Sequence, residues 1–199
     1  MKNIYLIGDS IRFGSTGDKG SPGYGIIVKE KLNGVANVFS PDENCRFAQY
    51  TLRNICDWRK KVDAESIDLV HWNNGLWDVM RLHGDESLTP IDMYTAMLER
   101  IYKKIRLFFP NAKIIFAFST SVIEENAPNG YVRYNSEIEE YNEAARKTME
   151  ALGVSVNDLY SITKNFDESY YADWVHPNAK GAEILANAVI ESIEKEISL

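Results

Sequence analysis

The chain has 199 residues, of which 45% are hydrophobic and 26% are charged, as in one ordinary globular domain. This composition excludes a disordered or fibrous protein, and the length is sufficient for a core that needs no disulfide or metal. The formal net charge is −7 without a basic run, which argues against nucleic acid and anionic membrane as partners. We expect a single domain over residues 1–199.

Apolar runs alternate with amphipathic stretches along the chain, and the runs are continuous, as in parallel strands buried on both faces. After Pro177, which can serve as a first-turn residue, the apolar stripe of a last helix follows. This order predicts an α/β protein, a three-layer α/β/α sandwich of flavodoxin-like outline with about five parallel strands. The predicted elements, in chain order, are strand 3–7, helix 25–32, strand 36–39, helix 47–62, strand 67–72, helix 91–109, strand 112–118, helix 134–152, a weaker strand 154–157, and the last helix with its stripe Ala182, Leu185, Ala186, Val189, Ile190, Ile193 and Ile197.

Neither the cysteines nor the apolar segments indicate a secreted or membrane-inserted protein. Cys45 and Cys56 form no CxxC pair, so we expect free thiols in a reducing compartment. The apolar run at residues 4–7 is too short for a signal-peptide core, and no segment approaches the roughly 18 apolar residues of a membrane span. We therefore expect a cytoplasmic location, unless a leader is missing from the sequence.

The first predicted strand ends in Gly8-Asp9-Ser10. In doubly wound folds, active sites lie beyond the carboxyl ends of the strands, and glycine permits the sharp turn that places a hydroxyl there. Ser10 is therefore a candidate nucleophile. The tripeptide alone is more typical of a turn or a helix cap, and it differs from the G-x-S-x-G elbow because Arg12 occupies the last glycine position.

Asp173 and His176 stand just before the last predicted helix. One turn at this spacing can bring the carboxylate to one ring nitrogen, which leaves the other nitrogen free to accept a proton from a serine hydroxyl. The alternative is a helix cap beside a surface histidine.

Amide groups gather after the third strand, at Asn73, Asn74 and Gly75. A carboxamide or backbone N–H at this edge of the sheet could stabilise an oxyanion. A simple Asn-Gly turn is the alternative.

Together the three motifs resemble the SGNH, or GDSL, hydrolase family of serine esterases and acylhydrolases. In that family the serine of a Gly-Asp-Ser motif follows the first strand and an Asp-x-x-His motif precedes the last helix, as Ser10, Asp173 and His176 do here. The resemblance implies the SGNH-hydrolase fold and a Ser-His-Asp triad that acts through an acyl-enzyme, with no metal or organic cofactor.

The resemblance departs at the two blocks that complete the family's oxyanion hole. Trp77 stands where the third block usually has an asparagine, so Asn74, Asn73, Gly75 or the indole of Trp77 itself could be the donor. The second block lacks a clear glycine, and there Asn44 and the Cys45 amide are the candidates.

The substrate implied is a small-molecule or glycan ester. The connections are short and leave no long lid over a deep lipid pocket, which favours short acyl or carbohydrate O-acetyl esters. Longer-chain acyl hydrolysis, of the lysophospholipase or thioesterase kind, is the alternative. Arg12 and Arg133 could pair with a negative group of the substrate, or be solvated or salt-bridged instead.

Other readings of the chain rest on weaker patterns. The glycine-rich loop 14–25 fits neither phosphate-binding motif, although a flavodoxin-like module could hold an FMN phosphate at Ser15-Thr16-Gly17 and stack Trp77 on its ring. A family fold that only binds acylated glycans is a third possibility. His71 and His83 have no metal-ligand spacing, so we expect core and surface roles for them.

Overall fold

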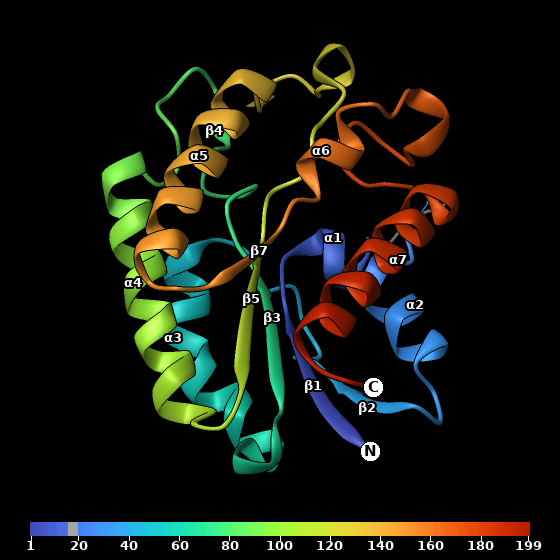
Figure 1. Ribbon diagram of the computed structural model, residues 1–199. Helices are drawn as coiled ribbons and strands as arrows, with labels where there is room; N and C mark the ends of the chain where they lie inside the picture. Colours follow the sequence, from blue (N-terminus) through green and yellow to red (C-terminus); the bar gives the residue numbers. More distant parts are fainter. Residues whose placement is uncertain (16–19) are drawn as a thin grey trace.

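The centre of the computed structural model, which describes residues 1–15 and 20–199, is a parallel sheet in the order β2-β1-β3-β5-β7 (Figure 1). The predicted α/β/α sandwich with five parallel strands is confirmed. Each strand lies within two residues of its expected bounds because the apolar runs that predicted the strands are buried in the sheet. The strands are β1 (Lys2–Ile7), β2 (Ala36–Phe39), β3 (Leu69–Asn73), β5 (Lys113–Ala117) and β7 (Ser155–Asn157).

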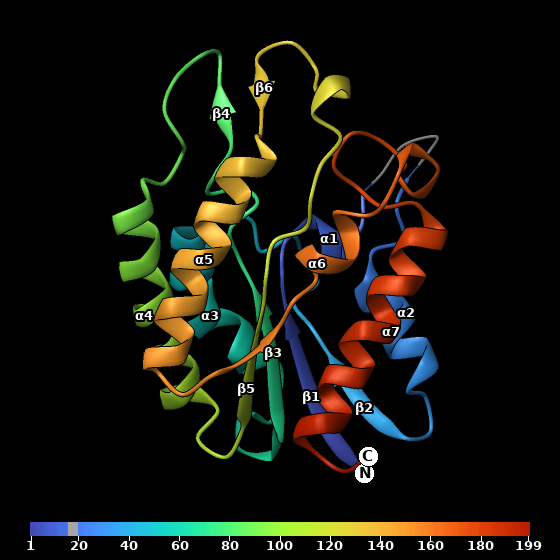
Figure 2. The ribbon, with the colours of Figure 1, turned by 45° about the horizontal axis from the view of Figure 1, so that its top comes forward.

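Helices cover both faces of this sheet. One face carries α3, α4 and α5, and the other carries α2 and α7, which pack against each other (Figures 1 and 2). No helix in the described part of the chain is both long enough and apolar enough to cross a membrane. The larger helices are α2 (Tyr24–Lys31), α3 (Ala48–Trp58), α4 (Ile91–Phe108), α5 (Asn135–Ala151) and α7 (Ala179–Glu196), and the single-turn helices are α1 (Ser10–Phe13) and α6 (Tyr160–Thr163).

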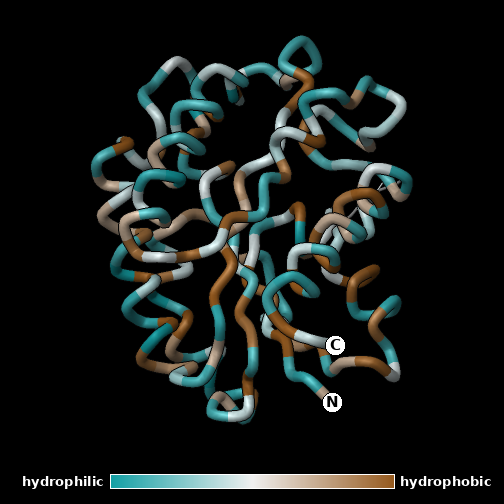
Figure 3. The backbone as a smooth tube through the Cα atoms, viewed as in Figure 1, coloured by the Kyte–Doolittle hydropathy of each residue, from teal (hydrophilic) through white to brown (hydrophobic). Residues whose placement is uncertain are grey.

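The core lies on the two faces of β1, β3 and β5. Apolar segments concentrate along these strands, while hydrophobic and hydrophilic stretches alternate along the helices (Figure 3). Trp72 on β3 packs edge-on against Phe116 on β5, and Tyr5 on β1 packs against Phe109 at the end of α4. His71 is buried within β3, as its place in a strand predicted.

A second, two-stranded antiparallel sheet was not predicted. It pairs β4 (Arg81–Leu82) with β6 (Tyr131–Val132), above the carboxyl ends of the main strands (Figure 2). Two residues are too few for a period-two pattern to be visible in sequence. Short 3₁₀ turns at Arg59–Lys61, Ala64–Ser66, Glu124–Asn126 and Glu168–Tyr170 were not predicted either.

The last helix begins later than Pro177 suggested. Its first residue is Ala179, and the Asn178 side chain accepts hydrogen bonds from the backbone N–H groups of Lys180 and Gly181. Asn178 Nδ2 also donates to the Ser169 carbonyl at 2.7 Å. The cap therefore joins the start of α7 to the preceding loop, which contains Asp173 and His176.

We predict that Asn178→Ala lowers the free energy of unfolding by about 1 kcal/mol, the usual effect of removing an N-cap acceptor. Urea denaturation measures the difference. Glu194→Ala, on the exposed side of the same helix, is the control and should change stability little. Equal effects of the two substitutions would contradict the capping role.

Candidate active site

The turn after β1 presents Ser10 at the carboxyl edge of the sheet. Asp9 caps α1 by accepting the Ile11 N–H on Oδ1 at 2.9 Å, and Ser10 is the first residue of that helix. Gly8 allows this close turn, because a Cβ there would lie 2.8 Å from the Cβ of Arg12. Ser10 is 7% exposed, and its side chain borders a cavity.

Asp173 and His176 approach Ser10 from the loop before α7. His176 Nε2 lies 2.8 Å from Ser10 Oγ, and His176 Nδ1 lies 2.7 Å from Asp173 Oδ2. The three residues thus form one hydrogen-bonded chain, although 166 positions separate Ser10 from His176. The loop is attached to the segment after β5, where the Ile123 N–H donates to the Trp174 carbonyl at 2.8 Å.

Hydrogen bonds keep Asp173 ionised. Burial by itself would raise the pKa of this carboxyl, but the His176 side chain and the backbone N–H groups of His176 and Val175 outweigh it and hold the pKa at about 2. Asp173 Oδ1 accepts both backbone N–H groups, at 2.7 and 2.8 Å, and leaves Oδ2 to the imidazole. A carboxylate fixed in this way orients the ring so that Nε2 faces the hydroxyl.

The buried Arg12 holds the second block, residues 41–46, against Gly8. The Arg12 guanidinium donates to the carbonyls of Pro41, Glu43 and Gly8 at 3.0, 2.6 and 3.2 Å. Arg12 therefore belongs to the scaffold, and its charge-assisted bonds satisfy loop carbonyls that no regular element would pair.

Of the two candidates predicted in this block, the Cys45 N–H is engaged with the scaffold, and the carboxamide oxygen of Asn44 is bonded to the backbone. The Cys45 N–H donates to the Gly8 carbonyl at 3.1 Å, and Asn44 Oδ1 accepts the Arg46 N–H at 2.8 Å. Arg46 has φ of 51°, in the left-handed region that favours glycine. This block therefore contains a left-handed turn at Arg46, although arginine gave no signal of it in the sequence.

Of the third block, Asn73, Asn74 and Gly75 lie in the scaffold. Both Nδ2 protons of Asn74 are donated, to the Arg46 carbonyl and to Thr51 Oγ1, and its Oδ1 accepts the Trp72 indole at 2.7 Å. This arrangement gives no support to Asn74 as an oxyanion donor.

Asn73 and Gly75 connect the ends of neighbouring elements. The Asn73 carboxamide lies between the Asp9 N–H and the Ala117 carbonyl, at 3.4 Å from each. Gly75 has φ of 142°, and a Cβ there would meet the hydroxyls of Ser119 and Tyr94. Trp77 borders the cavity together with Ser10, whereas the cavity lining does not include Asn44, Cys45, Asn73, Asn74 or Gly75.

The cavity over Ser10 has a volume of about 470 Å³ and a mainly apolar wall. Side chains alternate along β4 and β6, so that Leu82 and Tyr131 face the cavity while Arg81 points away from it. Arg133, just after β6, is the one arginine in the wall among the described residues. The lining residues are Ser10, Trp77, Met80, Leu82, Leu88, Pro128, Tyr131, Arg133, Trp174, Val175 and His176.

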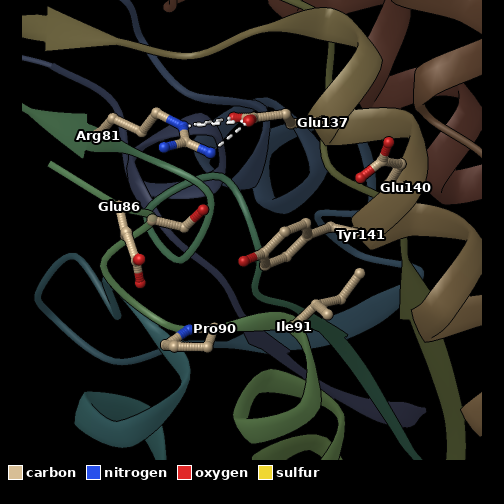
Figure 4. A pocket seen from close by; sticks show the side chains of 8 residues that line it. Arg81, Glu86, Pro90, Ile91, Glu137, Glu140 and Tyr141 are labelled. Atoms are coloured by element: carbon tan, nitrogen blue, oxygen red, sulfur yellow. Dashed lines mark hydrogen bonds and ion pairs between the residues drawn. The ribbon is translucent and has the colours of Figure 1, made fainter. Parts of the chain in front are cut away.

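A second pocket of about 390 Å³ lies beyond β4 and does not include Ser10 or His176. Figure 4 shows Arg81 on one side of it, paired with Glu137 of α5 at 2.6 Å. Tyr141 in the same pocket donates to the Thr89 carbonyl.

The glycine-rich loop is only partly described. Ser15 is bonded to Ser21 through both backbone and side chain, while Thr16 and Gly17, the other residues considered for an FMN phosphate, lie outside the described residues.

The model of the GDSL-like Lipase/Acylhydrolase family matches residues 6–184. The match begins in β1 and ends inside α7, so it covers the turn with Ser10 and the loop with Asp173 and His176. The chain belongs to this family, and it is accordingly a hydrolase that acts on ester bonds. No curated protein matches the chain.

Solved structures share the fold at low sequence identity. The lipase/acylhydrolase from Enterococcus faecalis is 21% identical with a TM-score of 0.77, and 98% of this chain and 97% of that chain are covered. The acetyl xylan esterase AlAXEase is 17% identical with a TM-score of 0.73, over 96% and 99%. A member of the lipolytic protein G-D-S-L family from Veillonella parvula DSM 2008 is 18% identical with a TM-score of 0.71, over 96% and 97%.

Asp78, just beyond Trp77, gives the fold a testable pH dependence. Burial raises the pKa of Asp78 to about 6, although the Ala48 N–H and Thr89 counteract it. The folded state then binds more protons than the unfolded state from about pH 4 to about pH 6, and stability falls as pH rises through this window. Relative to Asp78→Asn, the wild type should lose up to about 3 kcal/mol of unfolding free energy between about pH 4 and pH 7.

Asp68→Asn is the control of opposite sign. Burial alone would raise the pKa of Asp68, but hydrogen bonds from Lys2 and the Asn3 N–H lower it, so the wild type should gain stability over its variant as pH rises from the acid range. Urea titrations at a series of pH values measure both differences. A pH-independent difference between wild type and Asp78→Asn would contradict the raised pKa.

Proposed function

We propose that this protein is a serine esterase in which Ser10 is the nucleophile, His176 the general base and acid, and Asp173 the group that orients His176. The observation that carries the proposal is the hydrogen-bonded chain from Ser10 Oγ through His176 to Asp173, with 2.8 and 2.7 Å contacts. The family match to residues 6–184 supports the same reaction class.

The chemistry follows from these contacts. Ser10 Oγ attacks the ester carbonyl as its proton passes to His176 Nε2, and the tetrahedral intermediate collapses when His176 returns that proton to the leaving alcohol. A water molecule then gives its proton to His176 and attacks the acyl-enzyme, which releases the acid and restores Ser10. The ionised Asp173 stabilises the imidazolium in both halves of the reaction.

Two donors are proposed for the developing oxyanion. The Ser10 N–H is the first amide of α1, and the first amides of a helix have no acceptor within it. Trp77 is the candidate of the third block that borders the cavity with Ser10, and its indole N–H can donate. Asn74 and Cys45 are less suitable, because their N–H groups already donate to the scaffold.

The preferred substrates we propose are short acyl esters or carbohydrate O-acetyl esters. The acetyl xylan esterase among the similar solved structures supports this choice. The alternative is a longer acyl chain, and the observation that favours it is the apolar wall formed by Met80, Leu82 and Leu88.

Hydrolysis of p-nitrophenyl esters from acetate to decanoate tests the reaction and the chain length together. Ser10→Ala should lower kcat at least about a thousandfold without unfolding the protein, whereas Ser136→Ala, at an exposed position on α5, should leave kcat unchanged. A Ser10→Ala protein that retains more than about a tenth of the rate would exclude Ser10 as nucleophile. A maximum of kcat/KM at short chains supports the preferred substrates, and a rise toward decanoate supports the alternative.

Trp77→Phe tests the proposed oxyanion donor, because it removes the indole N–H and keeps most of the apolar ring. We expect kcat to fall at least about tenfold while KM changes little. Asn74→Ala should instead lower the unfolding free energy by about 1 to 3 kcal/mol, since Trp72 and Thr51 lose a buried partner. A larger loss of kcat in folded Asn74→Ala than in Trp77→Phe would reverse this assignment.

A further inference from the structure

Arg133 is a buried cation in the wall of the cavity that contains Ser10. It is 6% exposed and lies in the short segment between β6 and α5, in the wall of the cavity. Burying a charged group is costly unless it is paired or serves a ligand. The surroundings of the guanidinium therefore indicate which of these applies.

The hydrogen bonds of Arg133 leave most of its donors free. Nε donates to the Leu76 carbonyl at 2.5 Å, and the guanidinium lies over the Trp174 ring with its carbon 5.1 Å from the ring centroid. No acceptor is found for the other two guanidinium nitrogens among residues 1–15 and 20–199, and neither nitrogen is fully enclosed. They can therefore reach the accessible space of the cavity that Arg133 borders.

The charge of Arg133 is likewise uncompensated at close range. It takes part in none of the ion pairs found in the described chain. Asp9 and Asp173 are the carboxyl groups that act on it without forming an ion pair, and Asp173 is bonded to His176. Burial lowers the pKa of Arg133 to about 10 against the effect of these two groups, so Arg133 is still a cation near neutral pH.

Arg12 and Arg133 differ in how many of their guanidinium nitrogens have hydrogen-bond acceptors. Arg12 is equally buried, and its terminal nitrogens donate to three backbone carbonyls. Arg133 has a guanidinium held by Leu76 and Trp174, and two nitrogens remain in the fork geometry that matches a carboxylate or phosphate. A rigid, pre-oriented cation inside an apolar wall is suited to bind one anionic group of a ligand.

We propose that Arg133 selects ester substrates that carry an anionic group, a carboxylate in the simplest case, next to an apolar body. The proposal rests on the esterase function proposed for Ser10. The apolar body would lie against Leu82, Leu88 and Tyr131, and the anion would accept hydrogen bonds from the terminal nitrogens of Arg133. Arg133 is then a specificity residue that contacts the substrate away from the bond being cleaved.

Matched ester pairs test this selection on each side of the scissile bond. On the acyl side, p-nitrophenyl hemiadipate is compared with p-nitrophenyl hexanoate, and on the alcohol side meta-acetoxybenzoate is compared with phenyl acetate. The wild type should favour the anionic member of at least one pair by about tenfold or more in kcat/KM, the size expected for charge-assisted hydrogen bonds. Arg133→Met should abolish the preference, and Arg133→Lys should retain part of it.

The ratio of kcat/KM between the anionic and the neutral ester of a pair distinguishes substrate binding from a structural role. A variant that merely disturbs Trp174 and the His176 loop lowers kcat/KM equally for both esters and leaves this ratio unchanged. That result would overturn the proposal. So would a wild type that favours the neutral ester in both pairs. Arg81→Met is the matched control, because Arg81 is on the neighbouring strand but points to Glu137 outside the cavity (Figure 4). It should leave every ratio as in the wild type.

A binding measurement separates this proposal from the esterase function. Isothermal titration of the Ser10→Ala protein should show at least about tenfold tighter binding for the anionic member of the selected pair, and the Ser10→Ala/Arg133→Met protein should lose that difference. Tighter binding without hydrolysis by the wild type would leave the anion site in place and refute the esterase function. Hydrolysis of neutral and anionic esters at equal rates, with equal binding, would refute only the role of Arg133.

Discussion

The parallel hydrogen bonding of β1 with both β2 and β3 places the carboxyl ends of these strands at the same edge of the sheet. Ile7 is in register with Trp72, and Asn73 is in register with Ala117, so the segments after β1, β3 and β5 begin at one edge. Parallel strands need a crossover after each strand, and that crossover returns the chain to the opposite edge every time. Polar residues of these segments are therefore brought together although they are distant in sequence.

Buried polar residues convert this shared edge into a site of fixed geometry. Arg12 joins the turn after β1 to the loop after β2, Asn74 joins the end of β3 to Arg46 and Thr51, and Asp78 accepts the first N–H of α3 at 3.1 Å. Loops cannot satisfy their own backbone groups as helices and strands do. Side chains with several donors or acceptors supply those partners, which accounts for the dense polar composition around Ser10.

The sequence could be interpreted as far as burial or a short motif leaves a pattern in it. The larger helices were predictable because burial of one face leaves a period in the apolar pattern, and the strands because burial on both faces leaves a continuous apolar run. Ser10, Asp173 and His176 were predictable as candidates because short motifs place them at strand and helix ends. The direction in which Asn74 points was not, since an asparagine that donates to a loop carbonyl and one that faces a cavity have the same local sequence.

Two further features had no sequence signal for a physical reason. The left-handed backbone at Arg46 is set by the contacts of its neighbours, among them the Asn44 side chain, and not by the residue type. The β4–β6 wall consists of two-residue strands that are distant in the chain, and only their pairing reveals that Leu82 and Tyr131 share a face while Arg81 takes the other.

Different segments of the chain supply the reacting groups and the wall of the cavity. The hydrogen-bonded chain of Ser10, His176 and Asp173 depends on the turn after β1 and the loop before α7, whereas most of the cavity wall is contributed by residues between positions 77 and 133. Arg133, which stacks on Trp174, joins the two parts, as does the hydrogen bond from the Ile123 N–H to the Trp174 carbonyl. Substitutions in β4, β6 and their flanks can therefore reshape the space for a substrate while the reacting groups keep their geometry, and Arg133 is a position in the cavity wall where such a change would also reach the His176 loop.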